Sequence, residues 1–252
     1  MSIWIIGGTG DSATLTSAVS AVTSDYLVTV ATPEARKLYD AACNVIVGTM
    51  NGDSMAQFCH CYRISAIVDA SHPFAVNVSQ NAIAIAQKLN LPYLRYERAE
   101  INSGIRDHLK LDSFDTLLQG DYLLNQRVLL IVGCQVLPQF QPWQNRATLF
   151  ARVLPKLNSL QIALDSGFSS DRVITLRPPI TEALEKALWQ HWRISLVVTK
   201  ASGKFGGEDI KQKVAKQLGI SLITIARPKI IYPQQTSEIS EAIEFCFSHI
   251  EV

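Results

Sequence analysis

Short apolar runs alternate with segments of helical periodicity along the chain. β-Branched and aliphatic residues gather in runs of strand length that begin about 20 to 25 residues apart, the spacing of βαβ units in a parallel sheet. The first series of predicted strands comprises 3–6, 26–31, 44–47, 66–70 and 92–96, and the second comprises 128–132, 148–154, 173–176, 195–199 and 222–226. The pattern therefore predicts an α/β fold with mainly parallel sheets.

Several of the intervening segments carry an apolar stripe at helical spacing. A helix is predicted between Ala75 and Leu89, and further helices are predicted at 114–124, 181–191 and 207–218. The stripe is clearest near the C-terminus, where apolar residues recur at i, i+3, i+4, i+7, i+8 and i+11: Ile239, Ala242, Ile243, Cys246, Phe247 and Ile250. We expect this last stripe to pack against a sheet.

The polar segment 99–126 separates the two series of strands. We therefore predict two α/β domains, 1–112 and 113–252, with a boundary accurate to about ten residues. The chain has 252 residues and an apolar fraction of 48%, which is enough to bury a core in each domain and excludes a disordered protein.

Charge and cysteine content narrow the class of protein. Lys and Arg number 23 against 22 Asp and Glu, so the chain lacks the overall basic field of a nucleic-acid-binding protein. No apolar run approaches the roughly 20 residues of a membrane helix, and the N-terminus lacks the cationic region of a signal peptide. The five cysteines form no regular framework, which fits a reducing compartment. We expect a soluble cytoplasmic protein that binds neither nucleic acid nor membrane, in an oligomeric state that the sequence leaves open.

A glycine-rich loop follows the first predicted strand and consists of Gly7, Gly8, Thr9, Gly10 and Asp11. With Ala13 it satisfies the G-x-G-x-x-G/A pattern of dinucleotide-binding domains, in which a helix N-terminus offers N–H groups to a phosphate. Asp11, however, places a negative charge where a pyrophosphate would bind. The alternative is a tight turn in which Asp11 caps the helix.

A second candidate segment follows the fourth predicted strand, where Asp69, Ser71 and His72 precede Pro73. Ligands of open α/β sheets bind at the carboxyl ends of the strands, and a histidine beside an aspartate there can position or donate a proton. The alternative is structural: Ser71 caps the next helix and Asp69 holds the turn.

A third candidate is the loop after the predicted strand 195–199. Its glycines, hydroxyl group and lysine suit an anion such as a nucleotide phosphate or a substrate carboxylate: Lys200, Ser202, Gly203, Gly206 and Gly207. The spacing is not that of a Walker A loop. The alternative is a solvated, mobile glycine loop.

Other polar residues carry weaker signals. Adjacent residues on a regular element point in different directions, so Cys59, His60 and Cys61 are not expected to bind a metal. Arg95, Arg98 and Arg152 lie near the ends of predicted strands, and the pattern alone leaves open whether they are solvated, ion-paired or bound to an anion.

Four of these segments together resemble the precorrin-6A and cobalt-precorrin-6A reductase family of vitamin B12 biosynthesis. They match the family patterns G-G-T-x-[DE], D-x-[ST]-H-P-[FY]-A, P-Y-[LI]-R-[YF]-x-R and K-x-S-G-x-x-G-G, the last followed by an Arg-Pro pair, at 7–11, 69–75, 92–98, 200–207 and 227–228. The resemblance runs in order from residue 3 to about residue 228.

The resemblance implies two Rossmann-like domains with an interdomain cleft, and no metal or flavin prosthetic group. It implies an oxidoreductase that transfers a hydride from NADPH or NADH to a C=C bond of a tetrapyrrole macrocycle, giving precorrin-6B or its cobalt form. On this interpretation, the loops 7–11 and 200–207 bind the cofactor from opposite sides of the cleft. Catalytic roles fall to His72 and Asp69, and substrate binding falls to Ser71, Arg95, Arg98 and Arg152. The proton donor, the nucleotide and the presence of cobalt in the substrate stay open.

Two other functions remain possible from the residues alone. A non-catalytic NAD(P)-binding sensor module would use the first glycine loop but would leave the segments around His72 and Lys200 unexplained. A tetrapyrrole enzyme resembling uroporphyrinogen-III synthase would have twin α/β halves and need no nicotinamide. Titration with NADPH and NADH distinguishes these alternatives.

Overall fold

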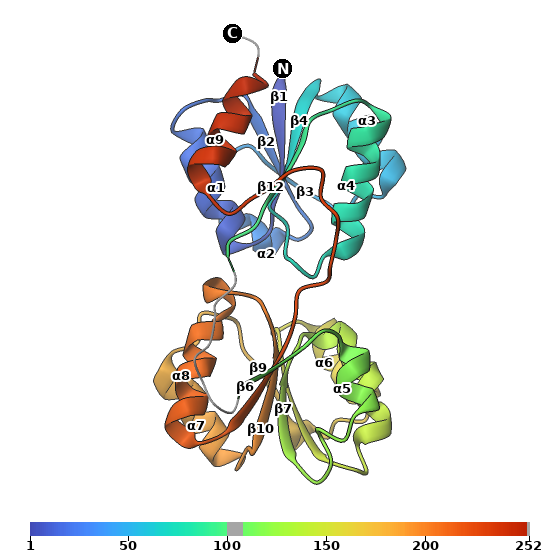
Figure 1. The fold of residues 1–252 in the computed structure, drawn as a ribbon, viewed down its shortest axis with the longest axis vertical. Helices are drawn as coiled ribbons and strands as arrows, with labels where there is room; N and C mark the ends of the chain where they lie inside the picture. The colour runs from blue at the N-terminus through green and yellow to red at the C-terminus, as the bar shows by residue number, and fades with distance from the viewer. Residues whose placement is uncertain (100–107, 251–252) are drawn as a thin grey trace. The chain divides into compact units, whose positions relative to one another are not determined.

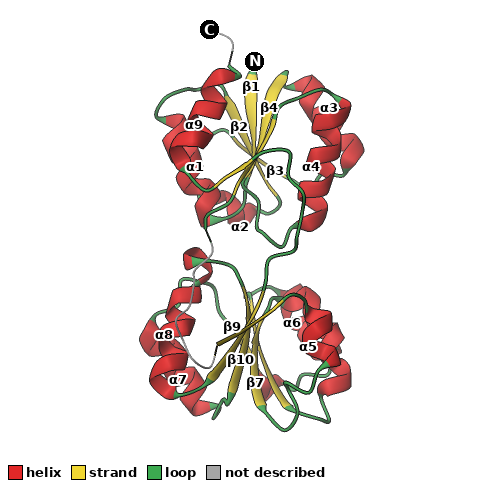
Figure 2. Ribbon diagram, in the orientation of Figure 1, coloured by secondary structure: helices red, strands yellow, loops and turns green. Residues whose placement is uncertain are grey.

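The computed structural model describes residues 1–99 and 108–250, which form two α/β units. The first unit comprises 1–99 and 228–250, and the second comprises 108–227. Each contains a six-stranded sheet in which every strand pairing is parallel, between layers of helices (Figures 1 and 2). All ten strands predicted from the apolar runs are present, so the predicted α/β class with parallel sheets is confirmed.

The sheet of the first unit has the strand order β12-β5-β4-β1-β2-β3. Its strands are β1 (Ser2–Ile6), β2 (Tyr26–Val30), β3 (Val45–Val47), β4 (Ile64–Asp69), β5 (Tyr93–Tyr96) and β12 (Gln235–Thr236). Its helices are α1 (Gly10–Ser20), α2 (Pro33–Arg36), α3 (Gly52–Cys61), α4 (Val76–Lys88) and α9 (Ile239–Ser248). Helices α1 and α9 cover one face, and α3 and α4 cover the other (Figure 1).

The sheet of the second unit has the order β6-β11-β10-β7-β8-β9. Its strands are β6 (His108–Leu111), β7 (Arg127–Ile131), β8 (Thr148–Val153), β9 (Val173–Thr175), β10 (Leu196–Lys200) and β11 (Ser221–Ile225). Its α-helices are α5 (Phe114–Gln119), α6 (Leu157–Asp165), α7 (Glu182–His191) and α8 (Glu208–Leu218), and its 3₁₀ segments are Cys134–Trp143, Ser170–Arg172 and Lys204–Gly206. Apart from the position of the sixth strand in the chain, both sheets therefore have the strand order of the Rossmann fold.

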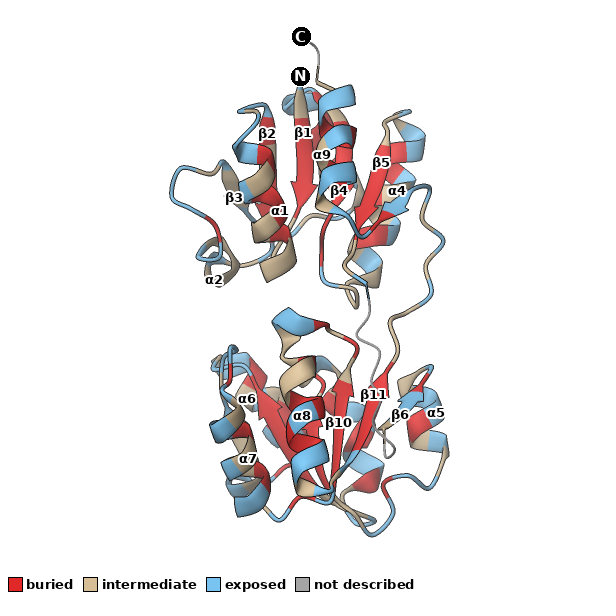
Figure 3. Cartoon of the chain, turned by 60° about the vertical axis from the view of Figure 1, so that its left-hand side comes forward, coloured by how far each residue is buried: buried red, intermediate tan, exposed pale blue. Residues whose placement is uncertain are grey.

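Successive side chains of a strand point to opposite faces of the sheet, so the core of the first unit is divided between these two faces. In β1, Ile3 and Ile5 pack with α1 and α9, whereas Trp4 and Ile6 pack with α3 and α4. Figure 3 shows the central strands almost wholly buried and the outer faces of the helices exposed. No helix in the described ranges is long and apolar enough to cross a membrane.

The observed division of the chain differs from the predicted domains 1–112 and 113–252. The segment after Arg227 returns to the first unit, where β12 pairs with β5 and α9 packs against α1. Near the predicted boundary, β6 lies within the predicted first domain but pairs with β11 of the second unit. The apolar stripe of α9 predicts a helix that packs on a sheet, but it does not identify which sheet.

The packing of α9 predicts different effects for two phenylalanines of this helix. Phe245 is 7% exposed within the core of the first unit, whereas Phe247 is 51% exposed. We expect Phe245→Ala to lower the free energy of unfolding by about 3 kcal/mol because it leaves a cavity, and Phe247→Ala to have little effect. Chemical denaturation measures the loss, and amide exchange should accelerate in the first unit alone. Faster exchange confined to residues 108–227 would contradict this placement of α9.

Candidate functional site

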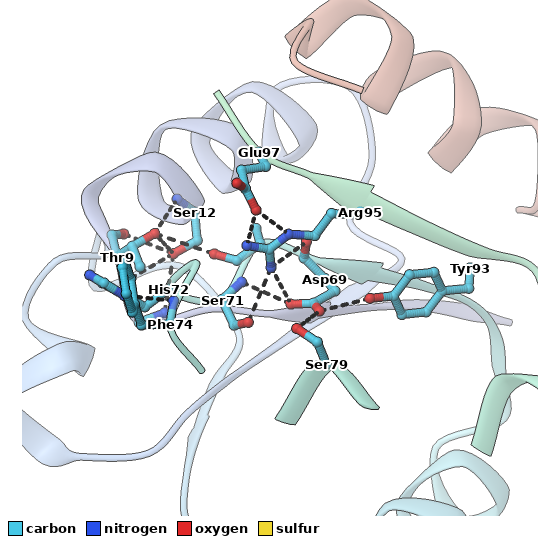
Figure 4. A network of polar contacts seen from close by, with 12 residues as sticks. Thr9, Ser12, Asp69, Ser71, His72, Phe74, Ser79, Tyr93, Arg95 and Glu97 are labelled. Carbon is cyan, nitrogen blue, oxygen red and sulfur yellow. Dashed lines mark hydrogen bonds and ion pairs between the residues drawn. The ribbon is translucent and has the colours of Figure 1, made fainter. Parts of the chain in front are cut away.

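The strand order of the first sheet reverses between β1 and β4, and the loops after these two strands contain two of the predicted site segments. Such a reversal is where open α/β sheets bind ligands, outside the carboxyl ends of the strands. A hydrogen bond of 3.3 Å from Thr9 Oγ1 to the carbonyl of Ala70 joins the two loops (Figure 4). The structure therefore brings the first glycine loop and the His72 segment together.

The first glycine loop uses several of its own N–H groups to close the turn. Gly8 N–H donates to Tyr39 Oη (2.8 Å) and to Ser12 Oγ (3.1 Å), and Thr9 N–H donates to Ser12 Oγ (2.9 Å). Ser12 N–H donates to Thr9 Oγ1 (3.0 Å), so Thr9 caps α1, and not Asp11 as the alternative of a tight turn proposed. These donors are already satisfied within the protein.

Tyr39 packs directly against this loop, which explains why position 7 is a glycine. A Cβ atom on Gly7 would lie 2.2 Å from Tyr39 Oη, a distance that no side chain could adopt without moving the tyrosine. Burial raises the pKa of Tyr39, so its hydroxyl stays protonated at neutral pH. Asp11 forms an ion pair of 2.7 Å with Arg98, which joins two of the predicted segments.

A buried carboxylate lies at the end of β4. Asp69 is fully buried: its Oδ1 accepts from Ser71 N–H (3.0 Å) and Arg95 Nη1 (3.0 Å), and its Oδ2 accepts from the hydroxyls of Ser79 (2.6 Å) and Tyr93 (2.8 Å). Figure 4 shows these side chains converging from β4, α4 and β5. The carboxylate therefore holds the start of the His72 segment to the neighbouring elements.

Arg95 lies in the same network, with no exposed surface. Its guanidinium binds Asp69 and also pairs with Glu97 (2.5 Å), so it already holds two carboxylates. Burial disfavours the cation, but Asp69 and Glu97 outweigh this effect and raise the pKa of Arg95. Burial, together with the charge of Asp69, also raises the pKa of Tyr93 far above its usual value. This environment does not fit the predicted binding of a substrate carboxylate by Arg95.

His72 is exposed at the carboxyl edge of the sheet, directly after this network. Its Nδ1 accepts a hydrogen bond of 3.1 Å from Phe74 N–H, which in the neutral ring places the proton on Nε2. Ser71 does not cap α4, whose first turn has no side-chain cap; instead, its hydroxyl lies 3.2 Å from Arg95 Nη1. Ser71 is 7% exposed, which leaves His72 as the accessible side chain of the pair.

The second sheet reverses its strand order between β7 and β10. The third predicted segment, 200–207, follows β10 and leads into α8. Gly203 and Gly207 have φ angles of 69° and 67°, which glycine adopts without strain, and a Cβ on Gly206 would lie 1.9 Å from Ser202 Oγ. Lys200 is half-buried, with Nζ 5.6 Å from the centre of the Phe114 ring, and burial lowers its pKa.

Two further findings concern residues that sequence reasoning misjudged or missed. Arg152 is 7% exposed and paired with Glu185 (2.5 Å), so it does not present the open guanidinium expected of a substrate-binding residue. Gly133, with a φ of 82°, follows β7 at the reversal of the second sheet and was missed. A glycine directly after a predicted strand was the available signal. Among the described residues, no cluster of side chains suited to a metal ion is found.

The contacts of Asp69 predict how Tyr93 contributes to stability. Tyr93→Phe removes one hydrogen bond to a buried carboxylate, so we expect the free energy of unfolding to fall by about 1.5 to 3 kcal/mol. Tyr62, which is 44% exposed, provides the matched control, and Tyr62→Phe should change the free energy of unfolding little. Urea denaturation measures both. Equal effects of the two substitutions would mean that the contact contributes nothing specific.

The chain is similar to known proteins over nearly its whole length. The family model for precorrin-6x reductase CbiJ/CobK matches residues 2–247. The cobalt-precorrin-6A reductase of Synechocystis sp. is 45% identical over 98% of this chain and 97% of its own length, and that of Priestia megaterium is 32% identical over 96% of each. The precorrin-6A reductase of Rhodococcus erythropolis is 29% identical over 95% of this chain and 93% of its own.

A solved structure supports the fold. The CobK precorrin-6A reductase superimposes with a TM-score of 0.81, covering 99% of this chain and 97% of that one, at 20% sequence identity. The sequence matches extend over nearly the whole chain and include all four of the segments that match the family patterns. The chain therefore belongs to the precorrin-6x reductase CbiJ/CobK family.

Proposed function

We propose that this protein reduces cobalt-precorrin-6A to cobalt-precorrin-6B by hydride transfer from NADPH or NADH to a C=C bond of the macrocycle. The observation that carries the proposal is the 45% identity, over 98% of the chain, to a protein named cobalt-precorrin-6A reductase. Two relatives named precorrin-6A reductase, without cobalt in the name, are 29% and 28% identical, so the relative at 45% identity is the reason for proposing the cobalt form. The sensor and the uroporphyrinogen-III-synthase-like alternatives have no such support.

The loop 200–207 is the part of the chain that best fits an anionic group of the nucleotide. Its glycines allow close approach of a ligand to the backbone, and Lys200 and the exposed Lys204 supply positive charge. When bound, the nicotinamide would supply the hydride. Both loops use most of their N–H groups internally: Gly8 and Thr9 donate within the first loop, and Gly203, Gly206 and Gly207 donate within the second or to Glu208. The two lysines are therefore the feature that favours the loop 200–207. The earlier prediction that the two loops enclose the nucleotide across a cleft stays a prediction.

His72 and Arg98 are the side chains of the first unit that we assign to the macrocycle. His72 is exposed and Arg98 partly so, and a histidine or a guanidinium suits a substrate that carries several carboxylates. His72 and water are the candidate donors of the proton that follows the hydride. Asp69 and Arg95 act in this proposal by holding the His72 segment, because neither is exposed.

An anaerobic assay tests the proposed reaction. We expect cobalt-precorrin-6A to be reduced with one equivalent of NADPH or NADH oxidised, and the metal-free substrate to react more slowly. Absence of nucleotide oxidation with both macrocycles would contradict the proposal. Binding of nucleotide without turnover would favour the sensor function instead.

The position of His72 predicts a catalytic effect without a structural one. His72→Ala should lower kcat about 10²-fold if the ring transfers the proton, because general acid catalysis contributes at least that factor. The exposed His60 offers a control, and His60→Ala should leave kcat unchanged. Steady-state rates across pH 5 to 9 measure the effect. Undiminished turnover of His72→Ala would assign the proton to water.

The half-buried position of Lys200 predicts an alkaline limit on nucleotide binding. Burial lowers its pKa below the ordinary value of 10.5, so the cation is lost at a lower pH than that of an exposed lysine. We expect KM for the nucleotide to rise in this alkaline range. Lys200→Met should raise KM about tenfold at pH 7 and flatten its alkaline increase. An unchanged alkaline increase in this variant would exclude Lys200 as its cause.

A further inference from the structure

Four charged side chains are buried beneath the loop 200–207. Their exposed fractions lie between 2% and 7%: Arg152, Glu185, Glu208 and Lys211. Burying charges is expensive, and replacing such a group with apolar side chains of similar size is often neutral or stabilising. Stability alone is therefore a weak explanation for this cluster. Its contacts with the backbone of the loop indicate a different role.

Two members of the cluster bind the backbone of the loop. Glu208 Oε2 accepts a hydrogen bond of 2.8 Å from Gly203 N–H, and Lys211 Nζ donates one of 2.5 Å to the carbonyl of Gly206. Gly203 is in the left-handed region, with a φ of 69°. One side chain thus holds the beginning of the turn and the other holds its end.

The remaining members, Arg152 and Glu185, form a second pair of opposite charge beside these two residues. Arg152 pairs with Glu185, which also accepts from Trp189 Nε1 (3.1 Å), so the cluster holds two cations and two carboxylates. Lys211 faces Arg152 of β8, Glu185 of α7, and Glu208 and Asp209 of its own helix. Burial, with a further contribution from Arg152, lowers the pKa of Lys211 to about 8, which leaves it mainly cationic at pH 7.

We propose that Glu208 and Lys211 are positioning residues that hold the loop 200–207 in the conformation that binds the anionic part of the nucleotide. This inference rests on the proposed function, because it concerns the same loop. The two side chains are themselves buried, so they act through Gly203 and Gly206 rather than by touching the ligand. A loop fixed before binding loses less conformational entropy when the ligand arrives, so its affinity depends on these contacts.

Variants at these two positions separate nucleotide binding from catalysis. We expect Lys211→Met to weaken NADPH binding about tenfold, measured by fluorescence titration at pH 7, while kcat at saturating nucleotide stays within about twofold of wild type. Glu208→Ala should have a similar effect, whereas Glu208→Gln, which keeps an oxygen acceptor for Gly203 N–H, should restore most of the affinity. Lys216, exposed on the same helix, provides the control, and Lys216→Met should bind NADPH as wild type does.

A second variant keeps the test valid if a single substitution unfolds the protein. Lys211→Met leaves the cluster with one excess negative charge, whereas the double variant Lys211→Met/Glu208→Gln leaves only the neutral pair of Arg152 and Glu185. We expect the double variant to retain a native circular dichroism spectrum and to bind NADPH about tenfold more weakly.

Two outcomes would overturn the inference, and they are distinguishable. Folded Lys211→Met and double variants with wild-type affinity, even with lowered melting temperatures, would show that the cluster serves stability alone. If the wild-type protein bound neither NADPH nor NADH, the proposed function would fail first, and the inference would fail with it.

Discussion

The ion pair between Asp69 and Arg95 is the interaction on which the candidate site of the first unit depends. Both side chains have no exposed surface, and their atoms lie 3.0 Å apart. Removing Arg95 would leave the buried Asp69 without its counter-ion, and removing Asp69 would leave the buried Arg95 with Glu97 alone, so either loss is destabilising. The pair is also local to the site, because Asp69 binds Ser71 N–H directly before His72. The position of the exposed histidine is thus set by groups that solvent does not reach.

The second unit follows the same arrangement with different residues. Its sheet has an equivalent reversal of strand order, and the loop after β10 is held by Glu208 and Lys211. In each unit, a segment at the carboxyl edge of the sheet is therefore held by buried, hydrogen-bonded charges. The near balance of 23 basic and 22 acidic residues conceals these buried pairs, which the overall composition cannot reveal.

Much of the fold could be predicted from the sequence because strand spacing and helical periodicity are local signals. The apolar runs locate ten strands, and the motifs place three loops at strand ends. The return of α9 to the first unit could not be predicted, because an apolar stripe does not specify its partner. The roles of Arg95 and Arg152 were misjudged for a related reason: whether an arginine binds a ligand or a buried carboxylate depends on residues distant in the chain, Asp69 and Glu185. Lys211 was missed since it lies beside the apolar stripe of α8 and has the pattern of a solvated residue.

A double-mutant cycle on Asp69 and Arg95 tests the central claim most directly. Asp69→Ala, Arg95→Ala and the double variant are compared by urea denaturation and by kcat/KM for the reductase reaction. The account predicts that each single substitution lowers the free energy of unfolding by about 3 to 5 kcal/mol, and that the double variant loses far less than their sum. It also predicts that all three lose kcat/KM to a similar extent. Additive losses in stability, or a wild-type kcat/KM in any folded variant, would contradict it.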